Sequence, residues 1–347
     1  MDTRRWSVDK IVDNLQSYPQ IIQASDQLIK NETVAFPTET VYGLGGNAQS
    51  DEAVSKIFAA KGRPADNPLI IHIAERSQLE AFVESVPEKA EKLISAFWPG
   101  PLTMIFNKRV GALSDLATAG LSTVAIRMPD HPVALALLKK TGLPIAAPSA
   151  NSSGKPSPTT ANHVWEDLHG RIAGIVDGGP TGVGVESTVI DCTEDIPTIL
   201  RPGGITKEQL MEAIGEVRLD PALQDSEQAP KSPGMKYKHY APDAPLYLVD
   251  GERAFMQKLV SEKRKEGLSV GVLTTEENKN YYDANVVITC GSRADLRTVA
   301  SGLYDALRRL NHENVDIIYG EIFPTEGVGA AVMNRLIKAA GHRIITN

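Results

Sequence analysis

The sequence predicts an α/β protein with two domains: a larger one built on a twisted mixed sheet with helices, and a smaller Rossmann-like one. Short apolar runs alternate with amphipathic segments in both halves of the 347 residues, which is the order expected of strands and helices. Between the two alternating regions, residues 220–245 hold five prolines and few aliphatic residues, as in a linker or a long loop. We therefore expect domains at 1–215 and 245–347, joined by a linker at 216–244.

The elements of the first domain follow from apolar runs of strand length and from longer stretches with helical spacing. Several predicted helices begin at an acidic or hydroxyl residue and end close to a glycine. Neighbouring runs between residues 172 and 200 are expected to pair as antiparallel hairpins, which makes the sheet mixed. The predicted strands are Thr33–Phe36, Leu69–Ile73, Leu102–Phe106, Thr123–Met128, Pro144–Ala147, Ile172–Val176, Thr188–Cys192 and Thr198–Leu200. The predicted helices include Asp51–Lys61, Gln78–Phe97 and His131–Thr141.

Beyond the linker, a second alternation of strands and helices predicts a Rossmann-like domain of about 100 residues, an ordinary size for one domain. Its predicted strands are Leu246–Val249, Ser269–Leu273, Val286–Thr289 and Val315–Tyr319, and its predicted helices are Gly251–Glu266, Arg293–Leu310 and Val328–Ala340.

The charge, the cysteine spacing and the lack of long apolar runs argue against several classes of protein. The formal net charge of -7 gives no broad basic surface for nucleic acid. Cys192 and Cys290 lie far apart with no CxxC, so neither a disulfide framework nor a zinc site is expected. The first residues, MDTRRWSVDK, lack the apolar segment of a signal peptide, and no apolar run approaches the ~18 residues of a membrane helix. We expect a cytoplasmic protein, monomeric by default, with no membrane partner.

A glycine-rich stretch, VAFPTETVYGLGGNA, covers residues 34–48 at the end of the first predicted strand. Pro37 fixes the direction in which the chain leaves the strand. We interpret the glycines that follow as a turn in which bare backbone approaches a ligand, the alternative being a tight turn that needs positive φ. The residues in question are Thr38, Glu39, Thr40, Tyr42, Gly43, Gly45 and Gly46.

Candidate cations lie in the segment AAKGRPADNPL, which follows the helix ending at Lys61. A basic residue at a helix C-terminus is commonly only a partner of the helix dipole. Here prolines hold Lys61 and Arg63 in place, next to Asn67, and rigid cations in an acidic domain suit a phosphate chain.

Two polar residues lie inside apolar strands. His72 is either a satisfied core residue or part of a site near the strand end. Arg127 lies in a strand, where it must find a carboxylate. That carboxylate belongs either to the protein, as a structural ion pair, or to a ligand, and the sequence favours neither.

Hydroxyls, an amide and a further arginine follow the later strands: Ser149, Asn151, Ser152, Ser153, Ser157, Ser187 and Arg201. The sequence contains no Walker A motif, no nucleophile elbow and no dense metal cluster. Such a site positions and neutralises polyanions, as phosphoryl or nucleotidyl transfer requires. From the residues we expect a nucleotide-using transferase with a small carboxylate-bearing co-substrate.

Several segments, in order, resemble the signature blocks of the YrdC-like family: FPTETVYGLG, KGRPxxNPL, PGPLT, VAIRMP, APSANxSGxPSPT, STVID and RPGGI. With SPGMKYKHYAP in the linker and the second α/β domain, nearly the whole chain resembles the long, two-domain form found among threonylcarbamoyl-AMP synthases. The resemblance implies condensation of L-threonine, bicarbonate or CO2, and ATP to threonylcarbamoyl-AMP and pyrophosphate. The product serves N6-threonylcarbamoyladenosine formation at position 37 of ANN-decoding tRNAs.

The resemblance also implies roles for single residues. It places L-threonine at Thr40, His72, Arg127, Ala147 and Ser187, and ATP at Arg63, Asn67, Thr123, Ser149, Ser157, Arg201 and Tyr240. It places the catalytic polar cluster at Lys61, Arg63, Ser149 and Asn151. Mg2+ is expected to arrive with ATP, since no dedicated ligand set is visible, and Glu39 receives no role.

From Tyr240 we expect residues 230–242 to act as a lid that keeps water from a labile anhydride. The product is expected to pass to the tRNA threonylcarbamoyltransferase complex, with direct tRNA binding weak or absent. Two alternatives stay open: a carbamoyltransferase acting on another acceptor, and an RNA-binding module. The sequence names no role for the second domain.

Overall fold

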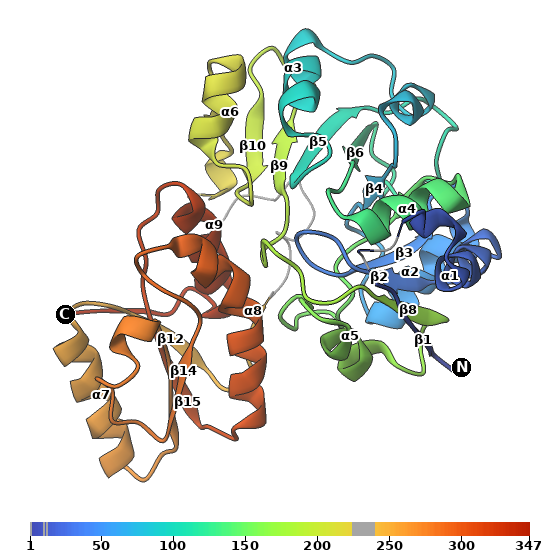
Figure 1. Ribbon diagram of the computed structural model, residues 1–347. Coiled ribbons are helices and arrows are strands. Elements are labelled where there is room, and N and C mark those ends of the chain that lie inside the picture. The colour runs from blue at the N-terminus through green and yellow to red at the C-terminus, as the bar shows by residue number, and fades with distance from the viewer. Residues whose placement is uncertain (1, 10, 12, 224–239) are drawn as a thin grey trace. The chain divides into compact units, whose positions relative to one another are not determined.

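The chain divides into two compact units in the computed structural model, which describes residues 2–9, 11, 13–223 and 240–347. The first unit contains residues up to 153 together with 158–182 and 186–223. The second contains 240–347 together with two short segments, 154–157 and 183–185. Both units are drawn in Figure 1.

In the first unit, the described strands form one mixed sheet in the order β1-β8-β2-β3-β7-β4-β6-β5-β9-β10-β11. Parallel pairs such as β4 with β6 alternate with antiparallel pairs such as β5 with β6, so the predicted mixed α/β sheet is confirmed. The strands are β1 (Arg4–Ser7), β2 (Val34–Phe36), β3 (Gly43–Asn47), β4 (Ile70–His72), β5 (Leu102–Asn107), β6 (Thr123–Arg127), β7 (Ile145–Ala146), β8 (Gly174–Asp177), β9 (Thr188–Asp191), β10 (Thr198–Arg201) and β11 (Arg218–Leu219).

Local chemistry sets the helix ends. In α2, Ser50 accepts a hydrogen bond from the Ala53 amide at the start, and Gly62 takes positive φ (64°) at the end. The predicted helix Gln78–Phe97 is wrong, because Pro87 separates a 3-10 turn from α3. The helices of the first unit are η1 (Leu15–Ser17), α1 (Pro19–Ile29), α2 (Asp51–Lys61), η2 (Arg76–Ala81), α3 (Glu88–Phe97), α4 (Pro132–Thr141), α5 (Ala161–Leu168), α6 (Lys207–Ile214) and η3 (Pro221–Leu223).

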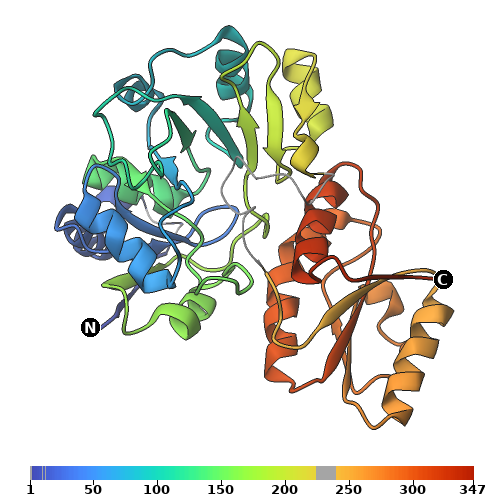
Figure 2. The same cartoon turned by 180° about the vertical axis from the view of Figure 1, so that it is seen from behind.

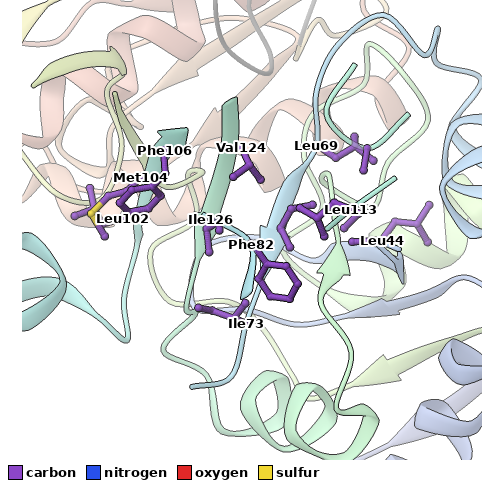
Figure 3. Packing of buried hydrophobic residues seen from close by; sticks show 14 of the residues in the cluster. Leu44, Leu69, Ile73, Phe82, Leu102, Met104, Phe106, Leu113, Val124 and Ile126 are labelled. Atoms are coloured by element: carbon purple, nitrogen blue, oxygen red, sulfur yellow. The ribbon is translucent and has the colours of Figure 1, made fainter. Parts of the chain in front are cut away.

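Helices cover both faces of this sheet. In β2, Ala35 belongs to one buried cluster, while its neighbours Val34 and Phe36 belong to another, as the alternation along a strand requires. The second cluster packs α1 and α4 together on their face (Figure 1). The larger cluster reaches α2, α3 and α5, and Figure 3 shows its side chains from strands β3, β5 and β6, including Leu44, Phe106 and Ile126.

One predicted strand pairing is wrong, one is confirmed, and one short strand lies inside the predicted linker. Ile172–Val176 was expected to pair with its neighbours up to residue 200, but β8 pairs in parallel with β1 and β2. The antiparallel pairing of β9 with β10 is confirmed. The linker was predicted to start at 216, yet Arg218–Leu219 forms β11 against β10, because backbone pairing needs no apolar run.

The second unit has a five-stranded parallel sheet in the order β14-β13-β15-β12-β16, which confirms the Rossmann-like α/β class. Figures 1 and 2 show α7 on one face of this sheet and α8 and α9 on the other. The strands are β12 (Leu246–Asp250), β13 (Val270–Thr274), β14 (Val286–Thr289), β15 (Ile317–Glu321) and β16 (Ile344–Thr346). The helices are α7 (Arg253–Lys265), η4 (Glu276–Asn278), α8 (Leu296–His312) and α9 (Val328–Ala339). In the part of the chain that the structure describes, no helix has the length and apolar character to cross a membrane.

The glycine-rich stretch is not the turn that the sequence predicts. Gly43, Gly45 and Gly46 lie in β3, and none of them has positive φ. A Cβ built on Gly45 would lie 2.8 Å from Phe36 Cε1 and 2.9 Å from Ile145 Cγ2. Gly45 therefore makes room for neighbouring core side chains, and does not open the backbone to a ligand.

We expect Gly45→Ala to lower the free energy of unfolding by about 1–3 kcal/mol, since the added methyl group overpacks the core. Urea denaturation measures this loss. Gly182→Ala is the matched control, because among the described residues its Cβ would meet only the Glu39 carbonyl oxygen, at 3.9 Å. A Gly45→Ala protein as stable as that control would contradict the packing role.

Candidate active site

Three neighbouring strands bring polar side chains into one row at the middle of the first sheet. Parallel pairing sets His72 of β4 opposite Arg127 of β6, and antiparallel pairing sets Arg127 opposite Thr103 of β5. Residues that pair across strands project from the same face. All three are buried, with 3%, 4% and 0% exposure. A polar row at this depth indicates a built site, because buried polar groups need partners.

The turn after β2 provides one of the hydrogen-bond partners of Arg127. Thr38 Oγ1 donates to the Val41 carbonyl at 2.6 Å and accepts from the amides of Thr40 and Val41, which fixes the turn. Arg127 Nη1 then donates to Thr40 Oγ1 at 2.9 Å, and Arg127 Nε donates to the Gly100 carbonyl at 3.3 Å. Thr40 and Arg127, both predicted site residues, therefore meet through the PTET turn.

The remaining nitrogen of Arg127 meets a carboxylate of the protein. Nη2 lies 2.5 Å from Glu39 Oε1, and the side chains are 5% and 14% exposed. This contact is an ion pair without hydrogen-bond geometry: within the described residues, Nη2 donates no hydrogen bond and neither oxygen of Glu39 accepts one. The sequence left open which carboxylate pairs with Arg127, and the structure assigns it to Glu39, to which the sequence gave no role.

Ser187 and Arg201 form a second contact beside this row. Ser187 Oγ lies 2.7 Å from Thr103 Oγ1, and Arg201 donates both to Ser187 Oγ at 3.1 Å and to its carbonyl at 2.9 Å. Thr103 was missed because it lies in an apolar run, and only its register with Arg127 reveals it.

His72 is a neutral group in this setting. Burial, reinforced by the charge of Arg127, lowers the pKa of His72 to about 3. Its Nδ1 lies 3.2 Å from the Ile70 carbonyl, and its ring meets Phe36 edge-on. At neutral pH, His72 can accept or donate a hydrogen bond but carries no charge.

A cationic cluster lies at the C-terminal end of α2. The buried Lys61 Nζ donates to the carbonyl of Asn151 at 2.7 Å and to that of Ser149. Ser149 Oγ in turn donates to Asn151 Oδ1 at 2.6 Å. Nearby in sequence, Arg63 Nη2 approaches the Asn67 carbonyl at 3.5 Å. Lys61 therefore fixes the loop that carries two of the predicted catalytic residues.

Strand β3 ties this loop to the PTET turn. The amide of Ala150 donates to the Tyr42 carbonyl at 2.8 Å, and the amide of Leu44 donates to the Pro148 carbonyl at 2.8 Å. The segment that runs from the PTET turn into the glycines thus contacts Arg127 at its start, and further along its backbone forms hydrogen bonds with the loop around Ser149–Asn151.

The structure also gives the positions of four other predicted residues. Thr123 starts β6, about 13 Å along the strand from Arg127. Ala147 donates its amide to the Ile70 carbonyl at 2.9 Å. Ser157 and Tyr240 belong to the second unit, where Tyr240 stacks on Tyr304 at 5.2 Å. Of the predicted lid, residues 230–239 lie outside the described residues.

The structure describes no alternative catalytic centre based on metal or thiol. Among the described residues, no group of three or more His, Cys, Asp and Glu side chains could hold a metal ion. Burial raises the pKa of both Cys192 and Cys290 to about 12, so neither thiol is a nucleophile at neutral pH.

A separate polar cluster lies in the second unit, at the carboxyl ends of its strands. Glu321 Oε1 accepts from Thr274 at 2.8 Å, Asn278 at 2.8 Å and Tyr282 at 2.9 Å, while Oε2 accepts from Arg293 at 2.9 Å. A cavity of about 520 Å³ adjoins Glu321 and Arg293. This is the edge of an α/β sheet at which ligands commonly bind, and the sequence named none of these residues.

Two family profiles match the chain. One, described as telomere recombination and covering Sua5, YciO and YrdC proteins, matches residues 26–203. The other, described as the C-terminal domain of threonylcarbamoyl-AMP synthase, matches residues 205–341.

Relatives of full length carry the same name as the second profile. The threonylcarbamoyl-AMP synthase of Bacillus subtilis is 60% identical over 346 residues, which cover 99% of this chain and 100% of that protein. That of Pyrococcus abyssi is 50% identical over 321 residues, covering 91% and 92%. That of Schizosaccharomyces pombe is 40% identical, covering 88% and 84%.

Solved structures agree with both units. P. abyssi Sua5 complexed with L-threonine matches with a TM-score of 0.92 and 47% identity, covering 99% of this chain and 100% of that one. E. coli YciO matches with a TM-score of 0.53 and 24% identity, covering 58% of this chain and 96% of that one, a likeness of fold alone.

The neutral state of His72 predicts a pH dependence of stability. The unfolded chain protonates this histidine near pH 6.5 and the folded protein near pH 3, so the unfolded state binds more protons between these values. The free energy of unfolding therefore falls as pH drops through this window, by up to about 1.4 kcal/mol per pH unit from this group. We expect His72→Gln to flatten the slope between pH 6.5 and 4, measured by urea denaturation.

His342→Gln, at an exposed position, is the control for loss of a histidine. A His72→Gln protein with the slope of the wild type would show that His72 is not held neutral by the fold.

Proposed function

Because this chain belongs to the threonylcarbamoyl-AMP synthase family, we propose that its first unit makes threonylcarbamoyl-AMP from L-threonine, bicarbonate or CO2, and ATP. The amine of threonine attacks CO2 and loses a proton, which gives an N-carboxylate. An oxygen of this carboxylate attacks the α-phosphorus of ATP, and the bond to the leaving pyrophosphate breaks. The chain is an enzyme of the transferase class, and its product serves tRNA modification at N6 of adenosine.

The observation that best supports this proposal is the burial of the Arg127 guanidinium with one donor that forms no hydrogen bond to the described residues. Arg127 is 4% exposed, and its Nη2 donates no hydrogen bond within the described residues. A buried donor of this kind suits an incoming carboxylate, which would accept a charge-assisted hydrogen bond from it. We place the carboxylate of threonine at Arg127 for that reason.

The groups around Arg127 suit the rest of an amino acid. Thr40 and Ser187 offer hydroxyls on either side, and Ala147 offers backbone. His72, being neutral, can receive a hydrogen bond from the amine without repelling the charge of an ammonium group. Threonine carries a carboxylate, an amine and a hydroxyl, and each of these groups would have a partner in this site.

The nucleotide takes the cationic side of the site in this proposal. Lys61 and Arg63 lie at the end of α2, and the loop fixed by Lys61 presents Ser149 and Asn151. These groups offset negative charge as the carbamate oxygen approaches the phosphorus, a role that needs position and not covalent chemistry. Further ATP contacts are proposed at Asn67, Thr123, Ser157, Arg201 and Tyr240.

Mg2+ is proposed to enter with ATP. The described residues form no carboxylate set that would hold it alone, which fits an ion carried mainly by phosphates and water. When bound, it would offset charge on the phosphate chain. We further propose that the protein works as a cytoplasmic monomer and passes its product to the tRNA threonylcarbamoyltransferase complex, without strong tRNA binding of its own.

The reaction predicts pyrophosphate release that depends on L-threonine. Release from ATP in the presence of bicarbonate is measured with L-threonine, with L-serine and without amino acid. We expect release with threonine, and a threonylcarbamoyl adenylate in rapidly quenched samples by mass spectrometry. Release at the same rate without any amino acid would contradict the proposed acceptor.

Lys61→Ala is expected to lower turnover by about 100-fold or more, because a fixed charge at the reacting phosphate is lost. Threonine affinity, which depends on Arg127, changes less, and titration calorimetry without ATP tests this. Lys56→Ala, on the same helix but paired with Glu32 and Glu52, serves as the control. An unchanged rate of pyrophosphate release in Lys61→Ala would refute the role.

A further inference from the structure

We propose that Glu39 is a resident substitute for the carboxylate of the substrate: it pairs with Arg127 in the empty site and leaves when the amino acid binds. This inference rests on the proposed function, in which Arg127 receives the carboxylate of threonine. It assigns to Glu39 the role of a positioning and specificity residue.

The charge of Arg127 requires a partner in the empty protein. A guanidinium buried to this depth in the middle of a sheet would be strongly destabilising without a counter-charge. Among the described residues, Glu39 is the carboxylate within ion-pair distance of it, at 2.5 Å. Glu39 therefore stabilises the site while no ligand is present.

In the ion pair between Arg127 and Glu39, a ligand carboxylate can take the place of Glu39. Arg127 forms hydrogen bonds through Nη1 and Nε, but its contact with Glu39 through Nη2 lacks hydrogen-bond geometry. An incoming carboxylate that accepts from Nη2 gains a charge-assisted hydrogen bond that Glu39 does not make. The ligand replaces an ion pair that lacks hydrogen-bond geometry with one that has it.

The backbone around Glu39 can stay in place during this exchange. The Glu39 carbonyl accepts from the Gly182 amide at 3.1 Å, and the hydrogen bonds of Thr38 hold the turn. Only the side-chain torsions of Glu39 need to change. Thr40 therefore keeps its contact with Arg127 whether or not Glu39 has moved.

Selectivity follows from this arrangement. A ligand must carry its own carboxylate to replace that of Glu39, since otherwise Arg127 is left buried and unpaired. Displacement also reduces the affinity for threonine by the free energy of the lost pair. Glu39 therefore lowers the affinity for threonine and restricts binding to ligands that carry a carboxylate.

The test is the affinity of Glu39→Gln for L-threonine, by titration calorimetry without ATP. Glutamine keeps the shape and removes the competing charge, so we expect the Kd to fall, by about tenfold if the pair contributes about 1.4 kcal/mol. L-Threoninol, which lacks the carboxylate, should bind the wild type much more weakly than L-threonine does. Glu32→Gln, whose partner is Lys56 on α2, is the matched control and should bind threonine as the wild type does.

Thermal melting separates this role from a structural one. Glu39→Gln should melt below the wild type when empty, and saturating threonine should raise its melting temperature by more than it raises that of the wild type. A loss of stability that threonine does not restore would overturn the proposal.

Other outcomes are equally decisive. Weaker threonine binding in Glu39→Gln would mean that Glu39 holds the ammonium group of threonine, and an unchanged Kd would mean that the pair persists in the complex. Either result overturns the inference while the proposed function stands. Threonine binding by neither wild type nor variant would overturn both.

Discussion

The buried guanidinium of Arg127 is the constraint on which the site depends. A charge in the middle of a sheet must be neutralised and hydrogen-bonded, and the PTET turn does both, with the hydroxyl of Thr40 and the carboxylate of Glu39. The same charge, together with burial, keeps His72 neutral. One arginine thus takes its partners from the PTET turn and reinforces the effect of burial on the protonation state of its neighbour across the strands.

Strand β3 connects this centre to the cationic one. Its glycines let Phe36, Ile145 and Ile57 pack against its backbone, and the same backbone bonds the loop that carries Ser149 and Asn151. Lys61 fixes that loop from the other side. In the proposed site, the groups placed around threonine and those placed around ATP are therefore linked through the backbone of this strand, which would hold the two reactants in a fixed geometry.

The second unit contains a buried acid of a different kind. Glu321 accepts three hydrogen bonds at one oxygen and pairs with Arg293 at the other. The difference from Glu39 is instructive: Glu321 has all its partners, whereas Glu39 has charge compensation alone. A carboxylate of the first kind supports the fold, and one of the second kind can be displaced.

The sequence by itself determined the α/β class, the two domains and most strands, because burial imposes its periodicity directly on the residues. It also singled out His72 and Arg127 as polar groups in apolar strands and Lys61 as a cation ahead of two prolines, whereas the family resemblance supplied the roles expected of them and of Thr40. It could not decide whether Arg127 pairs with the protein or with a ligand. It also did not show that the glycines form a strand, or that Thr103 lies in one row with His72 and Arg127. Those facts depend on strand register and on contacts between segments far apart in the chain, which no local pattern encodes. Only the tertiary structure brings Glu39 to Arg127 and leaves that pair without hydrogen bonds.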